Sequence, residues 1–204
     1  MTLSEPRQLI RQQIRQRRRQ LSVTEQELAG HAVKNRLQSL LEQSTIQRVA
    51  LYLSVDGELS TRPLIELCWA LAVDVYLPVL HPFSQGHLLF LKYTPQTQLI
   101  ENRFKIQEPK LNCLDVLPPA QLNILFTPLV AFDASGNRLG MGGGFYDRTF
   151  ATLPEQIQRI GLAHDLQYYP QLPIAEWDQP LDQIITPSKS WDWSTPLEYN
   201  SGNN

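Results

Sequence analysis

The chain has 204 residues, of which 42% are apolar and 19% are charged, a composition typical of one soluble globular domain. Its net charge of −2 argues against a nucleic-acid-binding surface spread over the whole protein. No apolar run approaches the ~20 residues of a membrane span, and arginines stand where a signal peptide would have its apolar segment. We therefore expect a cytoplasmic protein without a membrane or nucleic-acid partner.

The first twenty residues are strongly basic, with six arginines against one acid. They predict a helix, because a serine and a proline suit its first turn and no helix breaker follows before residue 21. Arg7, Arg11 and Arg15 are spaced four apart and therefore share one face of that helix. Residues 22–25, with the sequence SVTE, have the form of a capping box and predict a second helix with one apolar face.

From residue 48 onward, strand-like and helix-like segments alternate. Expected strands are RVALYL (48–53), VDVYLPVL (73–80), HLLFLKY (87–93), NILFTPLVAFD (123–133), RIGLAHD (159–165) and DQIIT (182–186); expected helices are TRPLIELCWALA (61–72), with Thr61 as its N-cap, and residues 145–153. A helix between two strands predicts a parallel crossover unit. The sequence thus predicts one α/β domain over residues 1–190 with a basic N-terminal helix, and a frayed tail over residues 191–204.

A glycine-rich segment, GNRLGMGGGFYDR (136–148), holds five of the ten glycines of the chain. It lies between a predicted strand and a predicted helix, where backbone N–H groups can close on an anion. Arg138 can donate two hydrogen bonds to phosphate oxygens, and Asp147 stands where a carboxylate could hold Mg²⁺. The spacing matches neither the P-loop nor the dinucleotide-binding fingerprint. The segment favours a nucleotide-phosphate site of another kind over a glycine-rich turn without a ligand.

The arginine helix allows three interpretations. It can present a solvated basic face, the usual outcome for such a helix, or a stripe that binds RNA or a membrane, although interleaved aromatic residues are absent. In the third interpretation the helix folds back and lays Arg7 and Arg11 on phosphates held by the glycine-rich segment. Position in the sequence does not choose among them.

Residues 132–148, FDASGNRLGMGGGFYDR, strongly resemble the signature of the 5-formyltetrahydrofolate cyclo-ligase family, also called 5,10-methenyltetrahydrofolate synthetases. The segments LYLSVDGELSTRPLIE, NRFKIQEP, IGLAHDLQ and LPIAEWDQPLDQIIT agree in the same order, so the resemblance covers residues 4 to 188. It implies a single Rossmann-like three-layer α/β domain with a mainly parallel, mixed central sheet. It also implies an ATP- and Mg²⁺-dependent conversion of 5-formyltetrahydrofolate to 5,10-methenyltetrahydrofolate, with release of ADP and phosphate.

The resemblance also implies roles for individual residues. Glu58 matches a carboxylate that binds the pterin, and Asp147 and Asp178 match Mg²⁺ ligands. The ATP-binding residues would be Arg7, Arg11, Arg138, Leu139, Gly140, Met141, Gly142, Gly143, Gly144, Phe145 and Tyr146. The substrate-binding residues would be Leu53, Glu58, Met141, Gly142, Gly143, Gly144 and Phe145. Two positions depart from the family pattern, since relatives often have Lys at position 7 and Tyr at position 145.

Several questions stay open at the level of the sequence. No general base is assigned. His164 ends a predicted strand, where active-site residues of α/β sheets gather, but position and spacing alone favour an ordinary polar residue over an acid–base group. The expected substrate is 5-formyltetrahydrofolate with or without a polyglutamate tail, bound by a monomer. A phosphosugar isomerase or CoA-transferase-like enzyme would leave Arg7, Arg11 and Asp147 unexplained as a set, and an RNA-binding module would leave the glycine-rich segment unexplained.

Overall fold

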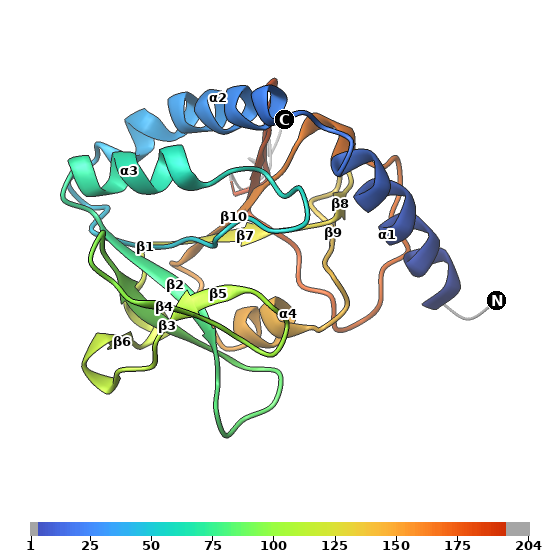
Figure 1. Ribbon diagram of the computed structural model, residues 1–204. Coiled ribbons are helices and arrows are strands. Elements are labelled where there is room, and N and C mark those ends of the chain that lie inside the picture. Colours follow the sequence, from blue (N-terminus) through green and yellow to red (C-terminus); the bar gives the residue numbers. More distant parts are fainter. Residues whose placement is uncertain (1–3, 195–204) are drawn as a thin grey trace, which may run out of the picture.

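The structure, a computed structural model, describes residues 4–194. It has three layers: a central sheet, helices α2 (Val23–Leu41) and α3 (Arg62–Ala70) on one face, and the short helix α4 (Phe145–Phe150) on the other (Figure 1). Helix α1 (Ser4–Arg18) lies to one side of these layers and packs against strand β8 (Ala131–Phe132). The predicted α/β domain with a basic N-terminal helix is confirmed.

The central sheet has eight strands in the order β12-β11-β10-β7-β1-β2-β3-β6. The inner strands pair in parallel, and the outer pairs at both edges are antiparallel, which is the expected mixed, mainly parallel sheet. In chain order the strands are β1 (Arg48–Ala50), β2 (Asp74–Leu80), β3 (Leu88–Tyr93), β6 (Val116–Leu117), β7 (Ile124–Pro128), β10 (Gln158–Leu162), β11 (Gln183–Ile185) and β12 (Ser190–Asp192).

Two small antiparallel pairs lie outside this sheet. Strand β4 (Leu99–Glu101) pairs with β5 (Gln107–Pro109), and β8 pairs with β9 (Arg138–Leu139). The predicted strand over residues 123–133 is therefore two strands, β7 and β8, separated by residues 129–130. As a result the glycine-rich segment begins in the turn of the β8–β9 hairpin and includes β9, and it does not follow the central strand directly.

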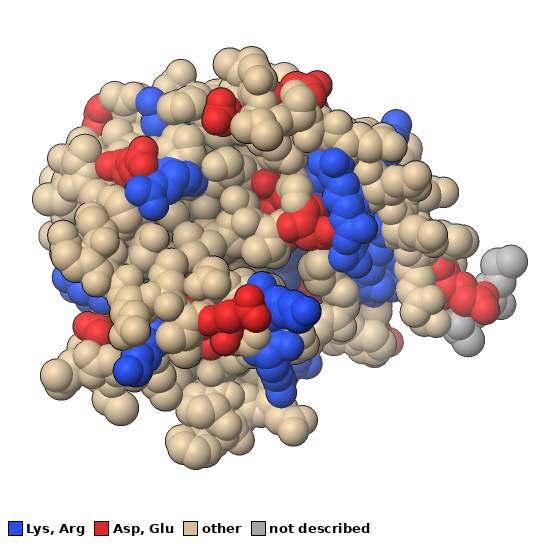
Figure 2. Space-filling view, in the orientation of Figure 1, with Lys and Arg blue, Asp and Glu red and all other residues tan. Residues whose placement is uncertain are grey.

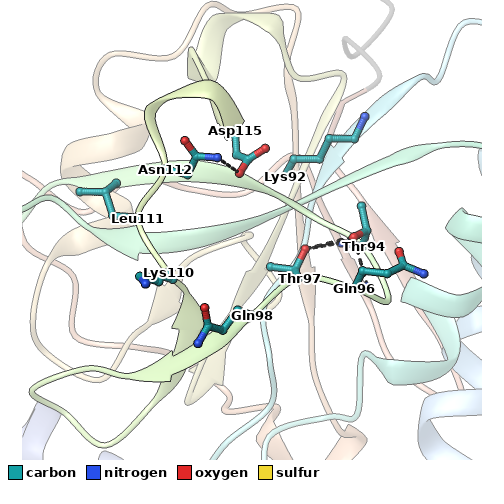
Figure 3. Close-up of a pocket in the computed structure, with 9 residues that line it drawn as sticks. All are labelled: Lys92, Thr94, Gln96, Thr97, Gln98, Lys110, Leu111, Asn112 and Asp115. Atoms are coloured by element: carbon teal, nitrogen blue, oxygen red, sulfur yellow. Dashed lines mark hydrogen bonds between the residues drawn. The ribbon is translucent and has the colours of Figure 1, made fainter.

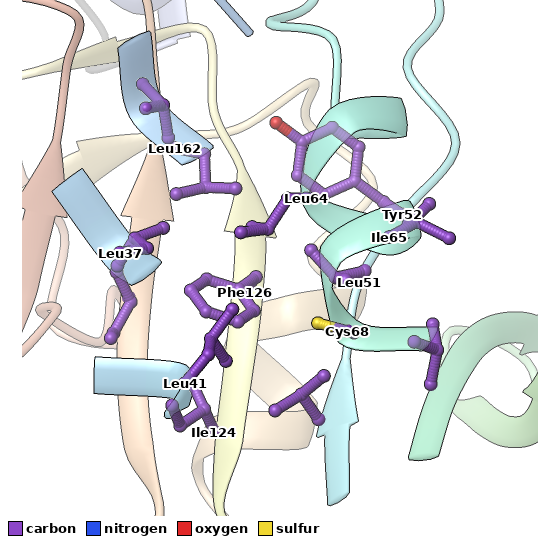
Figure 4. Close-up of a cluster of buried hydrophobic side chains, with 14 of the residues drawn as sticks. Leu37, Leu41, Leu51, Tyr52, Leu64, Ile65, Cys68, Ile124, Phe126 and Leu162 are labelled. Atoms are coloured by element: carbon purple, nitrogen blue, oxygen red, sulfur yellow. The ribbon is translucent and has the colours of Figure 1, made fainter. Parts of the chain in front are cut away.

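The core occupies both faces of the sheet because side chains along a strand alternate between them. Leu51 and Phe126 belong to the cluster covered by α2 and α3 (Figure 4), whereas Ala50 and Leu125 belong to the cluster on the α4 side. All four side chains are fully buried. The continuous apolar runs of β1 and β7 therefore reflect burial on two faces.

Both expected helix starts are confirmed, although only one of them has capping hydrogen bonds from its side chains. Ser22 and Glu25 form the predicted capping box: the Glu25 backbone N–H donates to Ser22 Oγ, and the Ser22 backbone N–H donates to the Glu25 carboxylate. Thr61 occupies the N-cap position of α3 as predicted, but its side chain makes no capping hydrogen bond, because its hydroxyl donates to the backbone oxygen of Tyr52. The Thr61 side chain therefore fastens α3 to the segment after β1.

The C-terminal boundary predicted at residue 190 is wrong, because it falls inside the antiparallel strand β12. Trp191 lies opposite Ile184 of β11 and stacks on Tyr168, with ring centroids 5.4 Å apart. The sheet and its aromatic packing thus continue to residue 193. The remainder of the predicted tail, residues 195–204, lies outside the described residues.

Candidate functional site

The strand order reverses between β1 and β7. The chain runs from β1 through α3 to β2 on one side, while β7 lies on the other side of β1. Ligands of open α/β sheets bind outside the carboxyl ends of the strands at such a reversal. The segment after β1 carries Glu58, and the segment after β7 leads through the β8–β9 hairpin to residues 140–144 of the glycine-rich segment. The topology therefore brings these two sequence-predicted segments to one edge of the sheet.

The glycine loop, defined as residues 140–144, presents its backbone to solvent. Gly142 and Gly144 have positive φ values of 103° and 65°, which residues other than glycine rarely adopt. Gly140 has ordinary φ, and a Cβ atom added there would meet no atom within 4 Å. Helix α4 after the loop has six residues, fewer than the nine predicted, so little helix dipole stands behind it. A ligand would therefore bind to the exposed loop backbone more than to the dipole of α4.

Arg11 connects α1 to the glycine loop. Its Nε donates a hydrogen bond of 2.8 Å to the backbone oxygen of Gly140, and its guanidinium lies about 3.5 Å from where a Cβ of Gly142 would stand. Burial, with neighbouring Arg7 as a second cause, lowers the pKa of Arg11. The helix therefore folds back on the loop, as the third interpretation requires, and Figure 2 shows its row of basic side chains with acidic ones beside it.

Arg7 and Asp178, predicted to bind phosphate and metal, respectively, contact each other. Two hydrogen bonds of 2.6 and 2.9 Å join the guanidinium and the carboxylate, whose side chains are 12% and 11% exposed. Asp178 also accepts a hydrogen bond from the backbone N–H of Ala175. Burial tends to raise the pKa of Asp178, but the bonds from Arg7 and Ala175 outweigh it and lower that pKa. The pair stays ionised at neutral pH.

Arg138 is buried, and each of its two terminal nitrogens donates a hydrogen bond. Nη1 donates to the backbone oxygen of Gln179 at 2.5 Å, Nη2 donates to Asp147 Oδ1 at 2.9 Å, and the guanidinium lies over the Phe150 ring. Burial lowers the pKa of Arg138, and Asp147 opposes that shift. In this structure the side chain fixes the loop and Asp147.

Asp147 and Asp178 have the donor chemistry that Mg²⁺ prefers. Mg²⁺ commonly takes one or two protein carboxylates and fills its other positions with phosphate oxygens and water. Both hydrogen bonds that residues 4–194 make to Asp147 reach Oδ1, so Oδ2 is available as a ligand. Within that range there is no cluster of three or more His, Cys, Asp or Glu side chains that could hold a metal ion. The residues therefore fit a metal shared with a phosphate better than a metal held by protein alone.

Glu58 is buried and is the last residue of the turn formed by residues 55–58. The backbone N–H of Val55 donates to its carboxylate at 3.2 Å, and the residue is 8% exposed. Burial raises the pKa of Glu58 to about 7, although Arg18 acts to lower it. Burial and the nearby Glu58 raise the pKa values of Tyr52 and Tyr146. The carboxylate is thus close to both phenols and can change its charge near neutral pH.

Apolar and cationic side chains extend the site beyond the predicted residues. The rings of Phe104 and Phe145 meet edge to face with centroids 6.1 Å apart, and Arg148 lies over Phe145. Arg148 also donates to the backbone oxygens of Gly86 and Gly143. Sequence reasoning singled out NRFKIQEP, which contains Phe104, without giving it a role. Leu53 is half-buried against the core, and Met141 is 49% exposed.

A separate pocket of about 480 Å³ lies elsewhere and contains none of the predicted site residues (Figure 3). It is near the ion pair of Lys92 with Asp74, the first residue of β2, and so at the amino end of that parallel strand. Its lining residues are Lys92, Thr94, Gln96, Thr97, Gln98, Lys110, Leu111, Asn112 and Asp115. A second hollow, of about 710 Å³, runs along α1 and includes Arg11 and Arg15. Of these two hollows, the second adjoins the candidate site.

The fold and the charged groups at the strand reversal define an α/β enzyme with its site at the carboxyl edge of a mixed sheet. Residues 3–187 match the model of the 5-formyltetrahydrofolate cyclo-ligase family. The chain belongs to this family, and it is a ligase of folate one-carbon metabolism. The resemblance carried by residues 132–148 is thereby confirmed.

Individual relatives agree with this assignment. The chain is 53% identical over 181 residues to the 5-formyltetrahydrofolate cyclo-ligase of Escherichia coli K12, covering 88% of this chain and 100% of the relative. It is 49% identical over 183 residues to the enzyme of the same name from Haemophilus influenzae, covering 89% and 98%. The fold matches the solved 5,10-methenyltetrahydrofolate synthetases of Aquifex aeolicus and Mycoplasma pneumoniae with TM-scores of 0.79 and 0.72, each at 26% identity. The matches cover 97% and 89% of this chain and 99% and 98% of those structures.

No helix within residues 4–194 is long and apolar enough to cross a membrane.

Proposed function

We propose that the site between the glycine loop and Glu58 binds ATP, Mg²⁺ and 5-formyltetrahydrofolate together and forms 5,10-methenyltetrahydrofolate, ADP and phosphate. One observation carries the proposal: α1 contacts both sides of the site. Arg11 of this helix binds the glycine loop, and its last turns bind Asp56, two residues before Glu58. The nucleotide side and the folate side are thereby held at a fixed distance.

The nucleotide side would hold the phosphates by charge and backbone donors. Arg11 stands at the loop, and Arg7 would exchange part of its bonding with Asp178 for a phosphate oxygen. Once in place, such groups stabilise the charge of a transferring phosphoryl group. Mg²⁺, held by Asp147 and Asp178, would neutralise phosphate charge when bound. Arg138 would keep Asp147 in place.

The folate side would use Glu58 as a hydrogen-bond acceptor for the N–H groups of the pterin. Because the pKa of the buried carboxyl is about 7, the acceptor is half ionised near neutral pH in the free enzyme. Leu53, Met141 and Phe145 would contact the pterin and aminobenzoyl rings. The Phe104 ring, which packs on Phe145, would complete the apolar wall.

The reaction needs orientation more than acid–base catalysis. The formyl oxygen attacks the γ-phosphorus and ADP leaves. N10 of the same folate then adds to the formyl carbon and loses its proton to water or to the phosphate, which departs with the former formyl oxygen. Phosphorylation converts a poor leaving oxygen into a good one, so the protein mainly has to position the groups that react and exclude water. We assign no general base. A monomer, a cytoplasmic location, a polyglutamate tail on the substrate, and the lack of nucleic-acid and membrane partners stay predictions.

The test is the near-ultraviolet absorbance that the conjugated methenyl product gains. Purified chain mixed with 5-formyltetrahydrofolate should form product only when both ATP and Mg²⁺ are present. Asp147→Asn should abolish this rise, while the control Asp192→Asn, at the edge strand β12, should retain it. Product formation without ATP, or equal rates in Asp147→Asn and wild type, would contradict the proposal. Salt-sensitive RNA binding that survives Glu58→Ala would instead support the RNA-binding alternative.

A further inference from the structure

Arg18, the last residue of α1, is a fully buried cation with a side-chain exposure of 0%. Its Nε donates to the backbone oxygen of Asp56 at 2.9 Å, Nη2 donates to the Asp56 carboxylate at 3.0 Å, and Nη1 donates to the backbone oxygen of Leu129 at 3.2 Å. A buried charge is costly unless it is paired and hydrogen-bonded. Because Leu129 directly follows β7, this one guanidinium joins the segments that follow β1 and β7.

The segment that Arg18 binds is a tight turn with strained backbone. Asp56 and Gly57 both have positive φ values, 54° and 74°, and the backbone N–H of Glu58 donates to the Val55 oxygen at 2.9 Å. Two consecutive positive φ values with this hydrogen bond define a type I′ turn. A Cβ on Gly57 would lie 2.9 Å from the Arg18 backbone oxygen. The end of α1 therefore touches the turn directly.

The turn decides where the Glu58 carboxylate lies. Glu58 is the last residue of the turn, and its carboxylate returns to accept the hydrogen bond from the Val55 N–H. If the turn opened, the backbone and side-chain bonds between these two residues would be lost together. Orientation of the carboxylate thus depends on the geometry that Arg18 and Asp56 maintain.

We propose that Arg18 is a positioning residue for folate binding, which it serves by holding the Asp56–Gly57 turn so that Glu58 faces the substrate. The inference rests on the proposed function, because Glu58 is taken as the folate acceptor. Arg18 itself touches neither substrate in this arrangement. Its effect reaches the folate side through the turn, and its charge also acts on Glu58 by lowering the pKa of that carboxyl.

Two other arginines bind the same aspartate but cannot replace Arg18. Arg15 donates to Asp56 Oδ2 at 2.7 Å and Arg19 donates to Oδ1, with side-chain exposures of 35% and 57%. Exposed ion pairs contribute little because water and salt screen them. Neither residue bonds the backbone oxygen of Asp56. They should keep the Asp56 carboxylate ionised when Arg18 is changed, but they do not hold its backbone.

The test compares Arg18→Met with Arg18→Lys, Asp56→Asn and the adjacent, exposed control Arg17→Met. Loss of charge-assisted hydrogen bonds in Arg18→Met should raise the KM for 5-formyltetrahydrofolate about tenfold to a hundredfold, while the KM for ATP stays near its wild-type value. Arg18→Lys should recover part of the lost folate affinity. Asparagine suits the left-handed conformation, so Asp56→Asn should likewise raise the KM for the folate and leave the KM for ATP near its wild-type value. Arg17→Met should match wild type. A rise of both KM values by the same factor, or no rise for the folate, would overturn the proposal.

Hydrogen exchange of the Glu58 amide gives a readout that does not depend on catalysis. The exchange rate should increase in Arg18→Met and Asp56→Asn and stay unchanged in Arg17→Met. An unchanged rate in both turn variants would overturn the positioning role. A wild-type chain that forms no methenyl product would instead contradict the proposed function, and the exchange measurement would still decide whether Arg18 holds the turn.

Discussion

Arg7 and Asp178 stand 171 positions apart in the sequence and share two hydrogen bonds at the edge of the site. The family resemblance gives them different ligands, phosphate for the arginine and Mg²⁺ for the aspartate. In the structure each neutralises the other, so neither charge is left without a partner before substrates bind. Binding of a magnesium–nucleotide complex would replace this one ion pair by two, Arg7 with a phosphate oxygen and Asp178 with Mg²⁺.

We expect Arg7→Met to lower the free energy of unfolding by about 1–3 kcal/mol at pH 7, because it leaves a nearly buried carboxylate without its charged donor. The folded pKa of Asp178 is lowered, so the stability from this pair is present above the unfolded pKa of about 4 and is lost as the pH falls through the folded value. Urea unfolding at pH 7 and near pH 3 measures the difference. A difference from wild type that is equally large at both pH values would contradict the prediction.

Glu58→Gln should stabilise the protein at pH 8 while weakening folate binding. The folded pKa of Glu58, about 7, exceeds its ordinary value of 4.5, so between these values the folded state binds more protons than the unfolded state. The ionised carboxylate therefore destabilises the folded state, and this destabilisation is fully present above pH 7. We expect a gain of about 1–3 kcal/mol at pH 8 that vanishes near pH 4. Thermal unfolding of both forms across this range checks the sign.

The same pKa predicts how activity depends on pH. If the ionised form of Glu58 accepts the pterin hydrogen bonds, kcat/KM of the wild type for the folate should fall as the pH drops below about 7. The amide introduced by Glu58→Gln has no charge to lose, so this variant should show a low and flatter profile. A wild-type kcat/KM that is constant between pH 8 and pH 5.5 would contradict the role of Glu58.

Gly140→Ala tests whether a ligand approaches the loop backbone. Gly140 has ordinary φ and open space where a Cβ would stand, so the free enzyme should keep its melting temperature. A bound phosphate group would meet the new methyl, and we expect the KM for ATP to rise at least about tenfold, or 1.4 kcal/mol.

Gly142→Ala is the matched comparison, because its φ of 103° is strained for alanine whether or not a ligand is present. This variant should lose stability as well as ATP affinity. An unchanged KM for ATP in Gly140→Ala would show that nothing passes close to that residue.

His164 should influence stability and not act as an acid or base at neutral pH. It is 4% exposed, and burial together with the charge of Arg18 lowers its pKa to about 4. Because the unfolded pKa is about 6.5, the neutral ring contributes stability above that pH, and about 1–3 kcal/mol is lost as the pH falls toward 4. His164→Gln should remove this slope and the exposed control His31→Gln should keep it, as thermal unfolding from pH 7 to pH 4.5 would show. A large loss of kcat at pH 7 in His164→Gln without loss of stability would contradict this.

Local signals were sufficient for most of the fold. Alternation of β1, α3 and β2 predicted the parallel crossover, and the SVTE sequence predicted the start of α2, because capping and hydrophobic periodicity are properties of neighbouring residues. Predictions that depended on a distant partner were less accurate. Thr61 lies at the predicted N-cap of α3, but its hydroxyl bonds Tyr52 and not the helix. Trp191 completes a strand where a frayed tail was expected, since β11 and Tyr168 supply its contacts.

The sequence by itself determined the family, through the residues of the glycine loop and its flanks, and it determined which residue types the chemistry needs. Only the tertiary structure decided which of these residues meet. It paired Arg7 with Asp178, buried Arg138 against Asp147, and drew the last turns of α1 onto Asp56. The physical reason is that charges inside a protein must find partners, and those partners are chosen by the folding of segments that lie far apart in the chain.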